Sequence, residues 1–450
     1  MFFSAMWREL GGDPAAAERV QFAGDGPLPS VFAVSGLAAS AIGAAGAAVA
    51  ELILTRFADA PRVCVDRKLS SLWFSWSMRP IGWELPNPWD PVAGDYAAAD
   101  GWIRLHTNAP HHRDAALSVL GAAAERAEVA RAVSRWEAHA LESSIVDRGG
   151  CAAMMRSQQQ WKQHPQGESV GAEPLLALET TGDTCRTHWS PDRHRPLRGI
   201  RVLDLTRVLA GPVATRFLAG FGADVLRIDP PAWDEPGVIP EVTLGKRCAR
   251  LDLRDPAGLA RLRELLREAD ILVHGYRADA LAKLGFTAQA RRELRPGLID
   301  VSLNAYGWSG PWRNRRGFDS LVQMSAGIAE TGMRALQRDR PTPLPVQALD
   351  HATGYLMAAA AIRGLTERLR VGRGFEARTS LARTAALLTS GPTADPSTSA
   401  GPASEGDWSD ETEHSGFGPL RRLRAPLEID EAPMHWDRPA SRLGAAPPEW

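Results

Sequence analysis

Between residues 197 and 390, short apolar segments alternate with amphipathic ones, and this alternation constrains the fold more than any other feature of the chain. Buried strands are predicted at 201–205, 224–229, 271–274 and 298–303. Helices are predicted between them, for example at 259–269 and 281–284. Strands that alternate with helices favour right-handed crossovers and a parallel sheet. We therefore expect an α/β fold, with a ligand beyond the carboxyl ends of the strands.

The rest of the chain divides by composition. Residues 1–190 are expected to form an N-terminal module, and 197–390 a Rossmann-like domain. Residues 391–416 are rich in Pro, Ser, Thr, Gly and acidic side chains, which is typical of a flexible linker. The last segment, 417–450, regains apolar and basic residues, so we expect it to return to the body of the protein.

The charge balance excludes several classes of partner. The net charge of the 450 residues is −1, so no general attraction to nucleic acid or to an anionic membrane is expected. The four cysteines show no CxxC spacing, and neither they nor His111 and His112 are spaced as metal ligands. The sequence thus predicts no metal site and reduced thiols in a cytoplasmic protein.

The most apolar stretch is 31–54, which is long enough to be tested as a membrane span. It consists mainly of Ala and Gly rather than Leu, Ile and Phe, and Glu51 lies inside it. These features favour a helix packed closely inside the protein over one that faces lipid.

One internal repeat has an offset of 312 residues. It aligns the Ala-rich helix near the N-terminus with HATGYLMAAAAIRGLTER, and PRVCVDRKLSSLWF with FEARTSLARTAALL. Asp350 then aligns with Ala38. A chance match of two Ala-rich helices followed by strands is the alternative.

The central region opens with the block LRGIRVLDLTRVLAGPVATRFLAGFGADVLRIDPP, at 197–231. Further blocks follow at 245–253, 269–286, 301–312, 317–332 and 346–381. In this order, the blocks resemble those of the family III CoA-transferases, the formyl-CoA transferase-like family. The resemblance implies a Rossmann-like domain with a second, smaller α/β domain.

The N-terminal third resembles the same family, but out of order. GDYAAADGWIRLHTNAP, at 94–110, is similar to the smaller domain that normally follows the catalytic half, and 417–430 is similar to the C-terminal return segment. The family parts are therefore expected in a fused and permuted order. Relatives are interlocked dimers, so the resemblance also implies a homodimer.

The resemblance implies that Asp350 is the nucleophile. A carboxylate at a helix N-terminus faces unpaired N–H groups, which are expected to keep it ionised. It can attack an acyl-CoA thioester to give a mixed anhydride, which CoA then converts to an aspartyl-CoA thioester. The alternative role for Asp350 is a simple helix N-cap.

The resemblance also implies the contacts to CoA, which would be a substrate, with no tightly bound cofactor. The matching positions are Leu209, Lys246, Arg247, Tyr276, Lys283, Asn304 and Tyr306. Cationic side chains among them are suited to phosphate groups, and the two tyrosines to the adenine ring. A solvated surface charge is the alternative for each Lys or Arg.

Other functions are open to the same residues. An acyl-CoA racemase shares this fold and uses a His–Asp pair, but Phe318 stands where its histidine is expected. A nicotinamide dehydrogenase would need G-x-G-x-x-G after the first strand, where TRVLAGPVA stands. A catalytically degenerate CoA-binding subunit is a third alternative, because no counterpart of the family's Gly-rich loop over the nucleophile is found.

Overall fold

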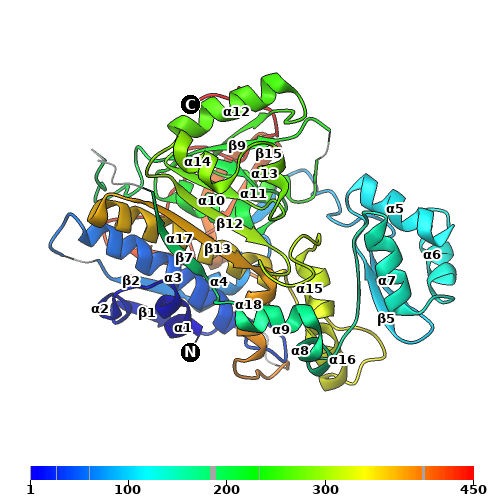
Figure 1. Ribbon diagram of the computed structural model, residues 1–450. Coiled ribbons are helices and arrows are strands. Elements are labelled where there is room, and N and C mark those ends of the chain that lie inside the picture. The colour runs from blue at the N-terminus through cyan, green and yellow to red at the C-terminus, as the bar shows by residue number, and fades with distance from the viewer. Residues whose placement is uncertain (1, 27, 60, 183–188, 233, 398–400) are drawn as a thin grey trace.

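The computed structural model describes residues 2–26, 28–59, 61–182, 189–232, 234–397 and 401–450 (Figure 1). A seven-stranded sheet forms its centre, in the order β10-β9-β8-β11-β12-β13-β7. The strands are β7 (Ala177–Thr181), β8 (Arg201–Leu205), β9 (Asp224–Asp229), β10 (Lys246–Arg250), β11 (Ile271–His274), β12 (Ile299–Asn304) and β13 (Gly374–Ser380). All neighbouring pairs are parallel except β13 and β7. The predicted α/β fold and its four strands are confirmed.

Helices cover both faces of this sheet. One face carries α12 (Pro256–Glu268), α13 (Ala280–Lys283) and α14 (Ala288–Leu294). The other carries α10 (Ala210–Gly220) and α17 (Ala348–Val371), which pack against each other. A Cβ on Gly354 would lie 2.4 Å from the carbonyl oxygen of Ala210, so glycine is required for this close approach. The contact brings the first turn of α17 to the start of α10.

The apolar stretch near the N-terminus forms α3 (Val34–Leu54), which lies beside α17 (Figure 1). By length and composition alone, α3 could cross a membrane. In the structure it is almost entirely buried, and the Glu51 carboxylate is paired with Arg363 and Arg370 of α17. Because a buried charge needs such partners, Glu51 indicates that α3 packs inside the protein.

The structure agrees with the internal repeat. After α3 come β2 (Val63–Asp66) and α4 (Arg67–Trp73); after α17 come β13 and α18 (Leu381–Thr389). Both copies therefore run helix, strand, helix at the predicted offset. Ala38 is fully buried in the first copy.

The N-terminal third is not one module. Its helices α1 (Phe2–Glu9), α2 (Pro14–Ala17) and α3 join the main body, and β7 joins the main sheet. A separate lobe, at the right of Figure 1, has its own core. It contains β4 (Gly94–Ala97), β5 (Trp102–Leu105), β6 (Ala152–Met154), α5 (Pro110–Leu120), α6 (Arg126–Val133) and α7 (Ala138–Asp147). This lobe is the smaller α/β domain that the sequence predicted.

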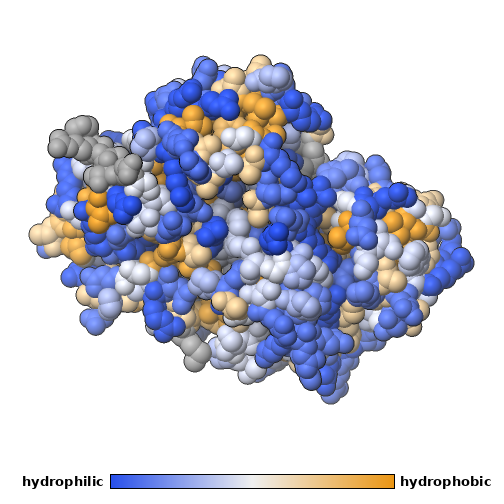
Figure 2. All heavy atoms as spheres, in the orientation of Figure 1, coloured by the Kyte–Doolittle hydropathy of each residue, from blue (hydrophilic) through white to orange (hydrophobic). Residues whose placement is uncertain are grey.

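Figure 2 shows hydrophilic residues over most of the face on view.

The segment 391–416 differs from its prediction as a flexible linker. Its second half forms β14 (Trp408–Ser415), which pairs with β15 (Gly418–Leu423), and β15 pairs with β3 (Met78–Pro80). The polar composition suggested a linker because most side chains of β14 are polar and face outward, although Trp408 is buried. Further on, β16 (Leu427–Ile429) pairs with β2, whose other neighbour is β1 (Val20–Ala23). The return of residues 417–450 to the body is confirmed.

A buried ion pair joins three distant parts of the chain. The guanidinium of Arg216, on α10, contacts the carboxylate of Glu241, on α11 (Ile239–Val242), and both side chains are almost completely buried. The Ser77 hydroxyl donates to Glu241 at 2.6 Å, and Arg422 of β15 donates to the same hydroxyl at 2.9 Å. The Trp436 indole donates to the Arg216 carbonyl at 2.9 Å. We call Ser77, Arg216, Glu241 and Arg422 the buried network.

Glu241→Gln is predicted to destabilise the protein strongly. It keeps the shape of the side chain but leaves Arg216 buried without a full counter-charge, a change that costs about 3–5 kcal/mol. Thermal unfolding should show a clearly lower midpoint than wild type. Asp252→Asn is the matched control, because its pair with Arg254 lies at the surface and should shift the midpoint little. Equal midpoints for the two variants would contradict the role of the network.

Candidate functional site

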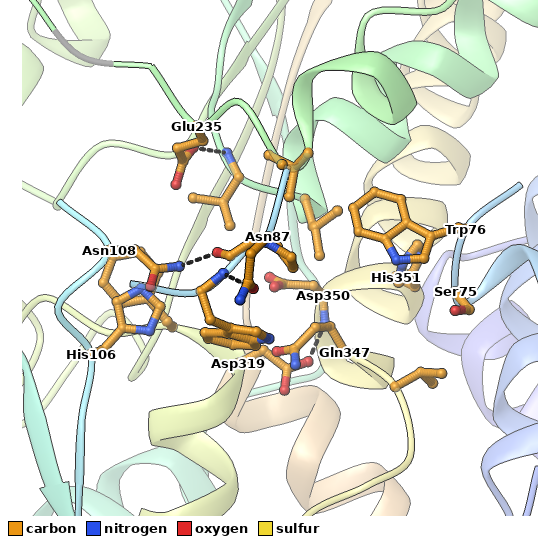
Figure 3. Close-up of a pocket in the computed structure, with 18 of the residues that line it drawn as sticks. Ser75, Trp76, Asn87, His106, Asn108, Glu235, Asp319, Gln347, Asp350 and His351 are labelled. Carbon is orange, nitrogen blue, oxygen red and sulfur yellow. Dashed lines mark hydrogen bonds between the residues drawn. The ribbon is translucent and has the colours of Figure 1, made fainter. Parts of the chain in front are cut away.

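Asp350 lies in the first turn of α17 and is buried, with 7% of the residue exposed. The helix N-cap is Gln347, and none of the described residues donates a hydrogen bond to the Asp350 carboxylate. Instead, the backbone N–H of Asp350 donates to Oδ2 of Asp319 at 2.9 Å (Figure 3). Asp319 therefore caps α17, and the interpretation of Asp350 as a simple N-cap is wrong.

The first of two cavities beside Asp350 has aromatic walls and a volume of about 400 Å³. We call it the aromatic cavity. Its rings are Phe74, Trp76, Trp89 and Phe318. The N-terminal third supplies Phe74, Trp76, Trp89 and His106, so residues far apart in the sequence complete it within one chain. Figure 3 shows Asp350 among the residues that line it.

The second cavity, of about 440 Å³, lies at the carboxyl ends of β8, β11 and β12, where the fold predicts a ligand. We call it the arginine cavity. Four arginine residues line it: Arg207, Arg277, Arg315 and Arg316. Of these, Arg315 is paired with the Glu142 carboxylate at 2.9 Å. His111 and His112 of the separate lobe lie at its other side. This concentration of positive charge is suited to phosphate groups.

Asp350, Val208 and Phe318 line both cavities, so these three residues stand between them. Val208 has a φ of 65°, a left-handed conformation that a β-branched residue rarely adopts. Its N–H donates to Oε2 of Glu235 at 3.2 Å. Such strain costs about 1–3 kcal/mol and is found mainly at functional sites.

Three carboxyl groups crowd this junction. Burial raises the pKa of Asp350 well above its ordinary value, and the charges of Asp319 and Glu235 raise it further. Burial also raises the pKa of Asp319 to about 6 and that of Glu235 to about 7. The raised pKa of Asp350 corrects the expectation that the helix terminus keeps this carboxyl group ionised. The backbone N–H of Asp350 already donates its hydrogen bond to the Asp319 carboxylate.

Stability should depend on pH through these groups. A carboxyl group with a raised pKa binds a proton more tightly in the folded state, so stability falls as pH rises from about 4 through the raised pKa values. Asp350→Asn removes one buried charge, and we expect its midpoint of thermal unfolding at pH 8 to exceed that of wild type by about 3–6 °C. The difference should shrink at pH 4.5.

Asp252→Asn is the matched control for this measurement. Hydrogen bonds from Arg254 lower the pKa of Asp252 to about 2, so its replacement should not stabilise the protein at pH 8. A lower midpoint for Asp350→Asn than for wild type at pH 8 would contradict the crowding of carboxylates.

Comparison with known proteins identifies the family. Residues 197–421, which contain every part of the sheet from β8 to β13 as well as Asp350, match CoA-transferase family III. The chain belongs to CoA-transferase family III. The match includes Arg207, Arg277, Arg315 and Arg316 of the arginine cavity, but not the N-terminal residues of the aromatic cavity.

Individual relatives match in part. An acyl-CoA transferase of Gibberella moniliformis is 30% identical over 266 residues, which are 55% of this chain and 46% of that protein. A succinate–glutarate CoA-transferase of Agrobacterium fabrum is 36% identical over 204 residues, 41% of this chain and 50% of that protein. A crystal structure of Rv3272 from M. tuberculosis has 29% identity and a TM-score of 0.41, covering 44% of this chain and 58% of that one. This family III chain spans about half the length of the curated relatives it matches.

Of the residues expected to contact CoA, three line the cavities. Tyr276 and Asn304 line the arginine cavity, and Leu209 lines the aromatic cavity. The side-chain amide of Asn304 is bonded to Gly307, to which it donates at 2.7 Å and from which it accepts at 2.8 Å. Its visible role is thus to hold the loop after β12.

The other four line neither cavity. Lys246 is buried and donates to Asp204 at 3.0 Å, and burial lowers its pKa to about 8. Arg247 is paired with Asp224 at 2.6 Å, and the exposed Lys283 with Asp279 at 2.5 Å. Tyr306 is buried, within 3.2 Å of the Ser325 hydroxyl. Each of the four thus has a protein partner in the structure, and its contact with CoA stays a prediction from the resemblance.

The four arginines of the arginine cavity were not predicted from the sequence. Arg207 and Arg277 lie in the loops that follow strands β8 and β11, so the rule that ligands lie beyond strand ends was a usable signal. No such signal existed for His106 or Trp89. Their place in the site depends on how the separate lobe docks against the main body.

Among the described residues, no group of three His, Cys, Asp or Glu side chains is arranged to hold a metal ion. Of the four cysteines, Cys185 lies outside the described residues. Cys64, Cys151 and Cys248 are free thiols.

Proposed function

We propose that this chain transfers CoA from an acyl-CoA thioester to a carboxylic acid, with Asp350 as the nucleophile. One observation carries the proposal: the Asp350 carboxyl lines both a cationic cavity at the strand ends and an apolar cavity. A thioester has the same two parts, a phosphate-bearing carrier and an acyl group, joined at the carbon that reacts. Asp350 therefore stands where that carbon would lie.

The chemistry follows from a carboxylate nucleophile. An oxygen of Asp350 attacks the thioester carbonyl carbon, and the C–S bond breaks. CoA leaves as the thiolate, and the acyl group remains bound to Asp350 as an acyl-aspartyl anhydride. The thiolate attacks the aspartyl carbonyl carbon, which releases the first acid and leaves an aspartyl-CoA thioester. The second acid repeats both steps in reverse and restores the carboxylate.

The crowded carboxyl groups favour this covalent step. An ionised Asp350 is repelled by Asp319 and Glu235 and has lost its water. Acylation replaces that charge by a neutral group, so the covalent intermediate is relieved of the repulsion that the free carboxylate experiences. A carboxylate with a raised pKa is also the stronger nucleophile once it is ionised.

In this proposal CoA binds in the arginine cavity as a substrate, and no tightly bound cofactor is required. Arg207, Arg277 and Arg316 would bind its phosphates, and Tyr276 would contact the adenine ring. The homodimer and the cytoplasmic location remain predictions from the sequence. The acyl donor and acceptor named in the relatives differ from one protein to the next, as in the succinate–glutarate and formyl-CoA:oxalate enzymes.

Covalent trapping tests the nucleophile. After mixing with a panel of acyl-CoA thioesters, the intact mass should rise by one acyl or CoA group, and hydroxylamine should convert the adduct to a hydroxamate at Asp350. Asp350→Asn should form no adduct and lose about three orders of magnitude of transfer rate. Asp252→Asn is the matched control and should behave like wild type. Full activity of Asp350→Asn would contradict the mechanism, and CoA binding without any adduct would favour the degenerate subunit.

Binding of CoA tests the arginine cavity separately. Arg277→Ala should raise the Kd for CoA about tenfold, which corresponds to about 1.4 kcal/mol, and should reduce its salt dependence. Arg313→Ala, in an exposed position outside both cavities, should leave the Kd unchanged. Calorimetric titration measures both. Equal Kd values for Arg277→Ala and wild type would place the phosphates elsewhere.

An acyl-CoA racemase is a second candidate because of one observation. Phe318 stands where the racemase histidine was expected, but His106 of the separate lobe stacks on Phe318, with ring centroids 3.7 Å apart. His106 and Asp350 both line the aromatic cavity. Incorporation of deuterium at the α-carbon of a 2-methylacyl-CoA in D₂O, lost in His106→Gln, would support this candidate over CoA transfer.

A further inference from the structure

The walls of the aromatic cavity distinguish among acyl groups. Besides its four rings, the cavity is lined by apolar side chains such as Leu209, Val238 and Val346. The rings come from three separate stretches of the chain, so apolar surface faces the space from several sides. Such walls favour an apolar group because its transfer out of water stabilises the complex.

The charged groups of the same cavity are all acidic. None of the described residues that line it is Lys or Arg, whereas five are carboxylic: Asp90, Asp234, Glu235, Asp319 and Asp350. Asp90 and Asp234 have arginine partners, which leaves Glu235, Asp319 and Asp350 to set the charge near the reacting carbon.

The two histidines do not supply a positive charge. Burial lowers the pKa of His106 well below its ordinary value, with Arg104 and His112 adding to the effect, and burial lowers that of His351 to about 3. Both are therefore neutral at physiological pH. The Arg104 guanidinium lies over the Trp89 ring, 5.1 Å from its centroid, and is paired with Asp95 at 2.8 Å. Arg104 does not line the aromatic cavity.

A second carboxylate on the acyl group would be destabilised by the apolar walls and acidic side chains of this cavity. It would lose its water beside three carboxyl groups, with no cation in the wall to replace that water. We propose that the acyl group of the thioester substrate is uncharged and apolar, aromatic or branched aliphatic, and that the site rejects dicarboxylic acyl groups. This inference rests on the proposed function, whose acyl group would occupy the aromatic cavity.

The test compares four thioesters with the wild-type chain. We expect benzoyl-CoA and isovaleryl-CoA to form the Asp350 adduct at least 100-fold faster than succinyl-CoA and glutaryl-CoA. Rates for the two dicarboxylic thioesters that equal or exceed those of the apolar ones would overturn the inference but leave the proposed function intact. Because all four carry the same CoA, a difference among them reports on the acyl cavity alone.

A cation placed in the wall should reverse part of this preference. Val346→Arg is expected to raise the ratio of succinyl-CoA to benzoyl-CoA reactivity at least tenfold. Val371→Arg, at the exposed end of α17, is the matched control and should leave the ratio unchanged. An unchanged ratio in a folded Val346→Arg variant would count against acyl selection by charge.

Free acids separate failure of the inference from failure of the proposed function. If no thioester forms an adduct, the proposed function fails, but the cavity can still be tested by thermal shift with benzoate and glutarate. Protection by benzoate and none by glutarate at equal concentration would support an apolar cavity that rejects a second carboxylate. Equal or stronger protection by glutarate would overturn it. This measurement also decides the question if Val346→Arg does not fold.

Discussion

The ion pair between Arg216 and Glu241 holds together the parts from which the site is built. Arg216 lies on the helix that starts directly after Val208 and Leu209, and Glu241 follows the loop that carries Glu235 and Val238. Ser77, which donates to Glu241, comes next to Trp76. Ser77, Arg216 and Glu241 are thus each close along the chain to a wall of the aromatic cavity. A buried pair of this kind contributes little net stability, but loss of one partner is costly, so it fixes one arrangement of the three segments.

The carboxyl groups of the site repel one another when they are ionised. Asp319 satisfies the start of α17 and, in doing so, places a second carboxyl group beside Asp350. Glu235 adds a third group, held by the strained Val208. Hydrophobic burial elsewhere in α17 and the pairing of Glu51 with Arg363 offset this unfavourable arrangement. The protein thereby keeps at its centre a carboxyl group whose ionised form is unfavourable.

The sequence predicted those features that local patterns determine. The strands of the central sheet and the position of Asp350 at a helix start follow from apolar periodicity and from the family's blocks. The role of Lys246 could not be predicted, because a lysine after a glycine has the same appearance whether it faces a phosphate or a buried Asp204. The contribution of Trp89 and His106 to the aromatic cavity was equally out of reach, since they join it only through docking of the separate lobe. Polarity likewise suggested a linker at residues 391–416, but backbone pairing of β14 with β15 determines the structure of residues 408–415.

The helices α3 and α17, which the internal repeat aligns, differ at the position of Asp350. Ala38 occupies the register of Asp350, fully buried and outside both cavities. A carboxylate restored there would be a buried charge with no space for a reactant beside it, so it would weaken the protein without creating a reaction centre. The small side chains of α3 instead allow it to lie directly against its counterpart. Helix α3 therefore carries no counterpart of the Asp350 carboxylate, and its role in the structure is to support the helix that does.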